Sequence, residues 1–182
     1  MILASQSPRR KDILKIAGYK FKIIKPDIDE SLDATLSIDE FPVELAYQKA
    51  KQIADQYPGE LVIGADTIVV LNNEIINKPV DRDDAIAMLS RLSGNMHIVI
   101  TGVCVIKGQK VRKFSDKSKV HFEKLTLDEI TYYVDHYKPY DKAGAYGVQD
   151  WIGMAAIKRI DGSFYNVMGL PIHKLYRLLK KF

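Results

Sequence analysis

The stretch Leu61–Ile76, which reads LVIGADTIVVLNNEII, says most about the fold. Its first part, Leu61–Leu71, is apolar and rich in β-branched residues, as is typical of a strand, and only Gly64–Thr67 interrupts it. The pair Asn72–Asn73 then predicts a tight turn into Glu74–Ile76, because asparagine tolerates the backbone conformation of hairpin turns. A hairpin pairs its strands antiparallel, so we expect a sheet that is not purely parallel.

On both sides of this stretch the pattern alternates between strands and helices, which predicts an α/β protein with a mixed sheet. The further strands expected are Ile2–Ala4, Phe21–Ile24, Met96–Ile106, Val120–Glu123 and Ala155–Ile160. The helices expected are Pro8–Ala17, Pro42–Tyr57, Asp81–Leu92, Thr126–His136 and Pro171–Lys181, the fourth with a capping box formed by Thr126 and Glu129. We interpret Arg112–Lys119 as a solvated strand or loop and Lys142–Gly153 as a structured loop.

Length and composition set the class of protein. The chain has 182 residues, 47% hydrophobic and 27% charged, which suits a single domain over residues 1–182 and argues against a disordered, collagen-like or coiled-coil chain. Its apolar runs are too short to span a membrane, and its one cysteine cannot form an internal disulfide. We therefore expect a cytoplasmic protein without membrane attachment. A net charge of +4 is too small for a dedicated nucleic-acid binder but fits a few cations that hold a small polyanion.

The segment Ser5–Arg10, SQSPRR, lies between an expected strand and the first turn of an expected helix. Backbone N–H groups and the helix dipole at such a junction, together with Arg9 and Arg10, make a candidate anion site. The alternative is an ordinary helix cap with two surface arginines.

Asp66 stands inside the most apolar strand of the chain, where an unpaired carboxylate is costly to bury. Two arrangements would account for it. It either holds a metal ion or a catalytic water at an exposed end of the strand, or it forms a structural ion pair with a lysine. Lys49 and Lys78 are single lysines that, taken alone, are more typical of a surface than of a site.

Two further polar segments are candidates. The carboxylates of Asp27–Asp33, Glu30 among them, suit a hard cation such as Mg²⁺, and their alternative interpretation is a solvated acidic loop. The segment Asp141–Gln149, DKAGAYGVQ, has small residues that let the backbone approach a ligand, and the Gln149 amide is able to read the edge of a base. No phosphate-binding P-loop, dinucleotide fingerprint, zinc-protease sequence or serine-nucleophile elbow is present in the sequence.

Together these segments resemble the Maf family of nucleotide pyrophosphatases, and they run in the family's order along nearly the whole chain. The matching segments are Leu3–Arg10, Asp29–Glu30, Gln48–Ala50, Gly64–Thr67, Lys78–Pro79, Leu92–Gly94, Asp141–Gln149 and Val167–Pro171. The resemblance implies a house-cleaning hydrolase that cuts nucleoside triphosphates between the α and β phosphates with Mg²⁺ or Mn²⁺. It also implies an elongated mixed β-sheet flanked by helices, with two lobes around a nucleotide-binding cleft, and a homodimer.

The resemblance further implies roles for individual residues. Ser5, Arg9, Lys49 and Lys78 would bind the substrate, with the three cations cancelling phosphate charge. Glu30 and Asp66 would hold the metal. Asp66 would also take a proton from the attacking water, and the sequence leaves open which of its two roles dominates.

Base selection is expected to depend on Arg9, Thr67 and Gln149, which resemble the branch of the family that acts on dTTP and UTP. Asp150 departs from the glycine that usually follows this glutamine, which affects the expected shape of the loop. Two alternatives stay open at this point. One is a regulatory binding protein of septum formation and cell division, and the other is a pyrophosphatase that prefers modified pyrimidine nucleotides such as 5-methyl-UTP.

Overall fold

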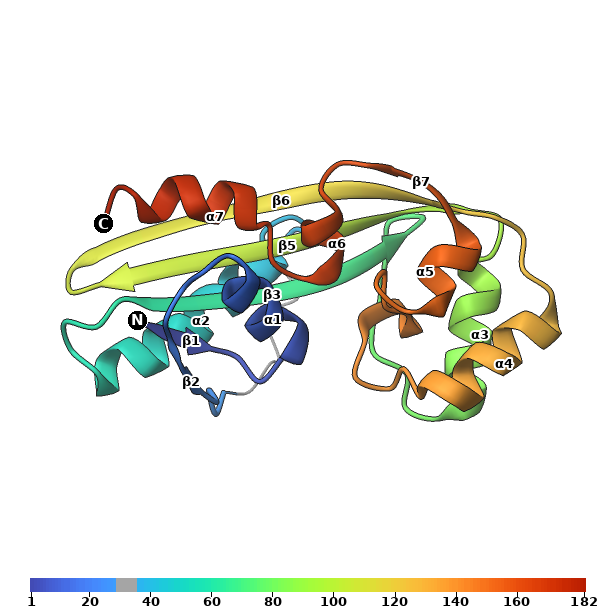
Figure 1. Ribbon diagram of the computed structural model, residues 1–182, viewed down its shortest axis with the longest axis horizontal. Helices are drawn as coiled ribbons and strands as arrows, with labels where there is room; N and C mark the ends of the chain where they lie inside the picture. The colour runs from blue at the N-terminus through green and yellow to red at the C-terminus, as the bar shows by residue number, and fades with distance from the viewer. Residues whose placement is uncertain (29–35) are drawn as a thin grey trace. The chain divides into compact units, whose positions relative to one another are not determined.

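The computed structural model describes residues 1–28 and 36–182, and Figure 1 shows the order of its helices and strands. The strands are β1 (Ile2–Ala4), β2 (Lys22–Ile24), β3 (Val62–Leu71), β4 (Glu74–Ile76), β5 (Met96–Lys107), β6 (Lys110–Phe122) and β7 (Ile157–Asp161). The helices are α1 (Pro8–Ile16), α2 (Phe41–Gln56), α3 (Arg82–Leu92), α4 (Leu127–Tyr137), the short 3₁₀ helix η1 (Ala143–Ala145), α5 (Trp151–Ala156), α6 (Phe164–Met168) and α7 (Ile172–Leu179).

The strands form one seven-stranded sheet in the order β2-β1-β3-β5-β6-β7, with β4 paired to β3. Strand β1 is parallel to both β2 and β3, whereas β4 is antiparallel to β3 and β7 is antiparallel to β6. The expected mixed sheet flanked by helices is therefore confirmed. Figure 1 shows β3, β5 and β6 as the long neighbouring strands of this sheet.

Local sequence signals place several elements where they were expected. Asn72 and Asn73 have φ angles of 50° and 65°, so the turn between β3 and β4 has the left-handed backbone that two-residue hairpin loops need. The capping box before α4 is also present, because the Thr126 hydroxyl accepts from the Glu129 N–H while the Glu129 carboxylate accepts from the Thr126 N–H.

Strand β6 runs from Lys110 to Phe122, so Arg112–Lys119, interpreted as a solvated strand or loop, is a strand that continues into the one expected at Val120–Glu123. The sequence left this segment open between strand and loop because its inward-facing positions include polar residues. Asp116 is buried against Lys174, whose ammonium is 2.5 Å away, and the buried Ser118 hydroxyl donates to the Ser163 carbonyl and accepts from its N–H. Polar side chains at buried positions mask the alternation that normally reveals a strand.

The segment after Gln149 also differs from the expectation. Residues expected as loop and strand form helix α5, and β7 begins only at Ile157. Gly153 suggested a loop, but it lies in α5, where a Cβ atom would collide with the Val148 backbone. The glycine therefore permits a close packing of helix on loop, with Ile152 and Ala156 fully buried. Helix α6 was not expected either.

The chain divides into two compact units. Unit 1 comprises Met1–Thr67, Ile100–Asp116 and Gly169–Phe182, and unit 2 comprises Ile68–Val99 and Lys117–Met168. Each unit has apolar residues of its own packed together, in unit 1 between α2 and its neighbouring strands and in unit 2 around α3, α4 and α5. The single domain over 1–182 and the nucleotide-binding cleft stay predictions.

His97 is a buried titratable group in the core of unit 2. Its Nε2 is 2.8 Å from the Tyr146 hydroxyl, and its ring makes edge-on contacts with Phe122 and Tyr146. Burial, with a smaller contribution from the charge of His121, lowers the pKa of His97 to about 4. The folded protein therefore keeps this ring neutral.

We expect this ring to make the protein sensitive to acid. Between pH 6.5 and 4 the unfolded chain binds a proton at His97 that the folded chain does not, so the free energy of unfolding should fall by about 3 kcal/mol as the pH drops through that range. Urea unfolding of the wild-type protein and of His97→Phe at several pH values measures this. The variant should be less stable at pH 7 but lose less stability on acidification. Parallel pH profiles for the two proteins would show that His97 does not cause the loss.

Candidate functional site

Helix α2 brings Lys49 to Asp66 in unit 1. Two glycines let the helix lie directly on the sheet, because a Cβ at Gly64 of β3 would collide with the Ala46 carbonyl, and one at Gly102 of β5 would collide with the Pro42 backbone. With the helix this close, Lys49 Nζ lies 2.7 Å from Asp66 Oδ1. Their side chains are only 9% and 14% exposed, so water screens this ion pair poorly.

Arg10 connects three other parts of unit 1. Its side chain is buried, and it donates from Nη1 to the Ser5 hydroxyl (3.1 Å), from Nη2 to the Thr67 hydroxyl (3.0 Å) and from Nε to the Gly169 carbonyl (2.9 Å). The Thr67 hydroxyl is also 3.0 Å from that of Thr101 on the neighbouring strand. A guanidinium suits this place because its donors point in fixed, diverging directions.

The expected anion site at the start of α1 is only partly available. Pro8 has no N–H, and the N–H of Ser7 donates to the Ser5 hydroxyl at 3.2 Å. Ser5 is therefore a buried acceptor for Ser7 and Arg10 that keeps its own hydroxyl hydrogen to donate. Arg9, the next residue on α1, is half-buried.

Unit 2 holds the other two predicted residues, Lys78 and Gln149. Lys78 is exposed and follows Asn77, whose carbonyl accepts from the N–H of Gly144 at 3.0 Å. This bond ties the segment before Lys78 to the turn at η1. Gln149 is also exposed, and its Nε2 donates to Asp150 Oδ1 at 2.9 Å.

Of the two predicted metal ligands, only Asp66 lies among the residues that the structure describes. Glu30, like Asp29 and Asp33, lies outside the described residues. Asp66 Oδ1 accepts a hydrogen bond from Lys49 Nζ at 2.7 Å, and the Asp66 side chain is 14% exposed. The described part of the chain contains no group of three or more His, Cys, Asp or Glu side chains able to hold a metal. A single carboxylate in the described residues suits an ion of the kind that is held by one or two carboxylates and completed by substrate phosphates.

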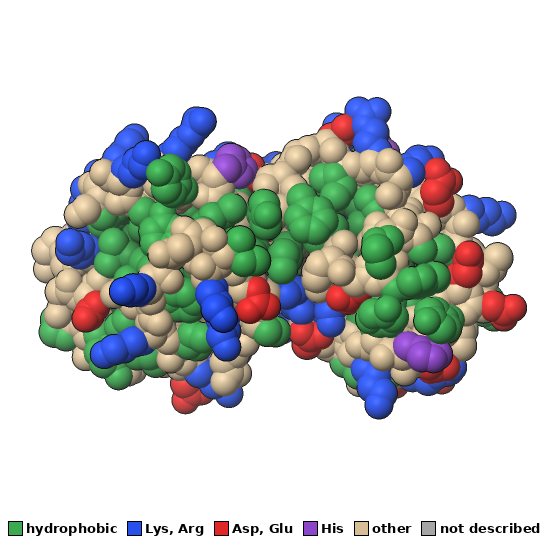
Figure 2. Space-filling model, viewed as in Figure 1, with side chains coloured by type: hydrophobic (Ala, Val, Ile, Leu, Met, Phe, Trp, Pro, Cys, Tyr) green, Lys and Arg blue, Asp and Glu red, His purple; other side chains and the backbone are tan. Residues whose placement is uncertain are grey.

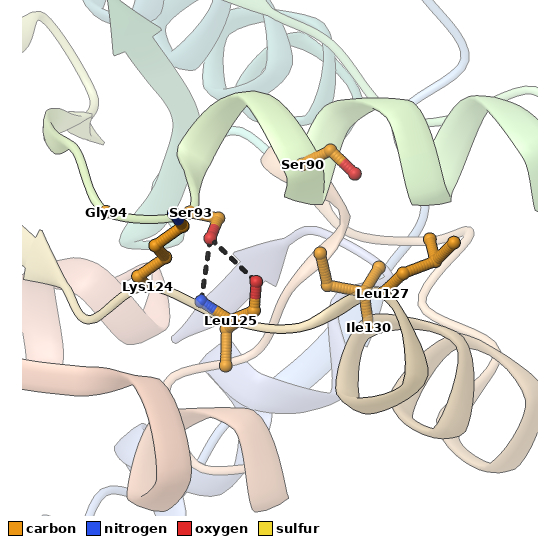
Figure 3. A pocket seen from close by; sticks show the side chains of 7 residues that line it. All are labelled: Ser90, Ser93, Gly94, Lys124, Leu125, Leu127 and Ile130. Carbon is orange, nitrogen blue, oxygen red and sulfur yellow. Dashed lines mark hydrogen bonds between the residues drawn. The ribbon is translucent and has the colours of Figure 1, made fainter.

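A pocket of about 440 Å³ lies in unit 2, beside the end of α3 and the start of α4 (Figure 3). Its lining residues are Ser90, Ser93, Gly94, Lys124, Leu125, Leu127 and Ile130. The Ser93 hydroxyl accepts from the Leu125 N–H and donates to its carbonyl, which closes one side. The lining has one cation and no carboxylate, and it includes none of the predicted site residues, so we assign it no role in the chemistry.

Comparison with known proteins decides the family. The model of the Maf family, described as Maf-like protein, matches residues 1–182. The chain belongs to the Maf family. Curated relatives agree with this over the full length of the chain.

A Maf relative from Cytophaga hutchinsonii, named dTTP/UTP pyrophosphatase, is 48% identical over 181 residues, which cover 100% of this chain and 83% of the relative. Relatives of the same name from Bacteroides thetaiotaomicron and Porphyromonas gingivalis are 49% and 47% identical, and the matches cover 100% of this chain and 95% and 94% of those proteins. Among solved structures, the Ham1 protein of Staphylococcus aureus is 16% identical with a TM-score of 0.47, covering 66% of this chain and 70% of that one. That likeness is too distant to bear on function.

Sequence reasoning about this Maf chain did not find the central position of Arg10. Both arginines were candidate anion ligands, and the family resemblance implied a role for Arg9 alone. A usable signal was present, because Arg10, Ile13 and Leu14 are spaced i, i+3 and i+4, and all three are buried on one face of α1. The hydrogen bond from the Tyr133 hydroxyl to Asp150 had no such signal in the sequence, because the two residues lie in different elements.

In the described residues no helix has the length and apolar character needed to cross a membrane.

Proposed function

We propose that this Maf protein is a nucleoside triphosphate pyrophosphatase that hydrolyses dTTP and UTP to the monophosphate and pyrophosphate. The observation that carries the proposal is the poorly solvated Lys49–Asp66 pair of unit 1, which places a carboxylate and an ammonium together next to the Arg10 network. The substrate class comes from the relatives, which are nearly half identical along the whole chain and carry the name dTTP/UTP pyrophosphatase.

The reaction joins a water oxygen to the α-phosphorus and breaks the bond from that phosphorus to the oxygen bridging the α and β phosphates. The pyrophosphate leaves with the electron pair of that bond. Asp66 accepts the proton that the attacking water loses, through the oxygen that Lys49 does not occupy. Lys49, Arg9 and Lys78 supply positive charge to the phosphates, and Ser5 donates its hydroxyl hydrogen to a phosphate oxygen.

The metal expected from the sequence fits the donor chemistry of unit 1. Asp66 would hold Mg²⁺ or Mn²⁺ together with Glu30, because carboxylate oxygens are the ligands these ions prefer. When bound, such an ion neutralises phosphate charge and makes a coordinated water more acidic. Lys49 compensates the charge of the Asp66 carboxylate before substrate arrives.

Selection of the base is assigned to Arg9, Thr67 and Gln149. Within unit 1 the Thr67 hydroxyl is already held by Arg10 and faces Thr101, so its position is fixed by the protein. Gln149 differs because it is exposed, and its amide offers both a donor and an acceptor to the edge of a pyrimidine.

Product analysis tests this function. Purified protein is incubated with Mg²⁺ and each of dTTP, UTP, CTP, GTP, 5-methyl-UTP and pseudouridine triphosphate, and the nucleotide products, pyrophosphate and phosphate are quantified. We expect monophosphate and pyrophosphate in equal amounts, fastest with uracil and thymine bases. Release of phosphate and a nucleoside diphosphate would contradict cleavage between the α and β phosphates, and a clear preference for a modified base would move the substrate to that nucleotide.

We further propose that the protein acts in the cytoplasm as a homodimer. Hydrophobic side chains gather over α4 and α5 on the face shown in Figure 2. In these helices Leu127, Tyr132 and Met154 are 63%, 45% and 80% exposed. Exposed apolar side chains of this kind often mark surfaces that another chain covers.

A further inference from the structure

Asp150 uses its side chain in an unusual way for its place in the chain. It is the N-cap residue of α5, where an aspartate normally accepts a hydrogen bond from a backbone N–H of the first helical turn. Asp150 makes no such bond. Its carboxylate instead accepts from the Tyr133 hydroxyl at Oδ2 (2.8 Å) and from Gln149 Nε2 at Oδ1 (2.9 Å).

Tyr133 anchors this carboxylate from the core of unit 2. Its side chain is fully buried on α4, and its hydroxyl also accepts from the N–H of Gly147 at 3.1 Å. Burial, and then the Asp150 carboxylate, raise the pKa of Tyr133, so its hydroxyl keeps the proton that it donates. Lys142 Nζ lies 3.9 Å from Asp150 Oδ2 and adds a favourable charge.

The loop leaves space for this arrangement. A Cβ atom at Gly147 would lie 2.5 Å from Asp150 Oδ2 and 2.6 Å from Gln149 Nε2. The two side chains therefore fold back over the Gly147 backbone, and a larger residue at position 147 would force their ends to shift.

The carboxylate also fixes which way round the Gln149 amide lies. An ionised carboxylate only accepts hydrogen bonds, so it attracts the amide NH₂ and repels the amide carbonyl. One N–H of Gln149 is consequently held by Asp150. The carbonyl oxygen Oε1 and the second N–H are left for a ligand, and the exposure of Gln149 allows a ligand to reach them.

We propose that Asp150 is a positioning residue for base selection, which holds the Gln149 amide so that Oε1 accepts the ring N3–H of uracil or thymine. This inference rests on the proposed function. Cytosine has an unprotonated N3 at the same place, so two acceptors would face each other and binding would be disfavoured. A glycine at position 150 would have no side chain to orient the amide.

The experiment compares kcat/KM for UTP and CTP in the wild-type protein, Asp150→Asn and Asp150→Gly. An asparagine at position 150 is able to donate as well as accept, so it no longer dictates the orientation of Gln149. We expect the UTP-to-CTP ratio to fall about tenfold in both variants, the scale of one mismatched hydrogen-bonding group. The change should appear mainly in KM, and UTP should still be cleaved to UMP and pyrophosphate.

Two controls separate positioning from general support of the fold. Asp135→Asn removes a different aspartate of unit 2, one that binds Arg82 at the surface, and it should leave the ratio unchanged. In the nucleotide-free wild-type protein, ¹⁵N NMR should show the Gln149 side-chain amide exchanging its hydrogens more slowly than in Asp150→Asn.

The outcomes distinguish the inference from the function on which it rests. An unchanged ratio in Asp150→Asn, or an equal drop on UTP and CTP, overturns the positioning role and leaves the pyrophosphatase in place. Identical amide exchange in the two proteins also overturns it. Absence of pyrophosphate release by the wild-type protein from every nucleotide overturns both.

Discussion

Replacing Asp66 by asparagine is expected to lower kcat for dTTP and UTP at least about 100-fold, the usual scale for the loss of a general base. Asparagine has nearly the same volume as aspartate, and its Oδ1 is able to accept from Lys49 Nζ, which lies 2.7 Å from Asp66 Oδ1. The fold should therefore persist. What the variant loses is the ability to take a proton and to bring negative charge to a metal. Steady-state rates and the melting temperature, measured on the same preparation, test both parts.

Asp55→Asn is the matched control. Asp55 lies on α2 and is also paired with a lysine, Lys51, but that pair is at the surface, with Asp55 59% exposed. The control should keep both its rate and its melting temperature. If Asp66→Asn cleaves dTTP at nearly the wild-type rate with unchanged melting, the Lys49–Asp66 pair is structural and the mechanism proposed above is wrong.

Most of the fold could be predicted because the deciding signals are local. The Asn72–Asn73 turn, the capping box at Thr126 and the apolar β3 each depend on residues that are neighbours in sequence. The extent of strand β6 was left open for the opposite reason. Its buried Asp116 and Ser118 are satisfied by residues more than forty positions away, such as Ser163, and a pattern of polar and apolar residues cannot show those partners.

The candidate site could also be predicted only where its signals are local in sequence. Lys49 was assigned a role only through the family resemblance. The sequence itself led to Asp66 and Gln149 because their segments are distinctive, and it kept a lysine pair for Asp66 as one of two arrangements. It did not show that the partner is Lys49, because this contact requires α2 to lie against the glycines of β3 and β5. It also treated Asp150 as a disturbance of the loop, whereas the structure gives its carboxylate two specific partners.

Arg10→Ala is expected to lower the free energy of unfolding by about 4 kcal/mol, because it leaves three acceptors in or near the core without their donor, at about 1–3 kcal/mol each. These are the hydroxyls of Ser5 and Thr67 and the carbonyl of Gly169. Gly169 has φ of 115°, a backbone conformation that side chains disfavour, and the hydrogen bond from Arg10 helps to hold it. Urea unfolding at pH 7 measures the change.

Two further substitutions show whether this loss comes from the guanidinium network. Arg10→Lys keeps the charge, but one ammonium cannot reach acceptors that lie in three directions, so it should recover less than half of the lost stability. Arg9→Ala removes the adjacent, half-buried arginine of α1, and it should change the free energy of unfolding by less than about 1 kcal/mol while it slows turnover. If Arg9→Ala destabilises the protein as much as Arg10→Ala, the loss belongs to helix α1 in general. Equal stability of Arg10→Lys and the wild-type protein would show that charge alone, and not the geometry of the guanidinium, holds Ser5, Thr67 and Gly169 together.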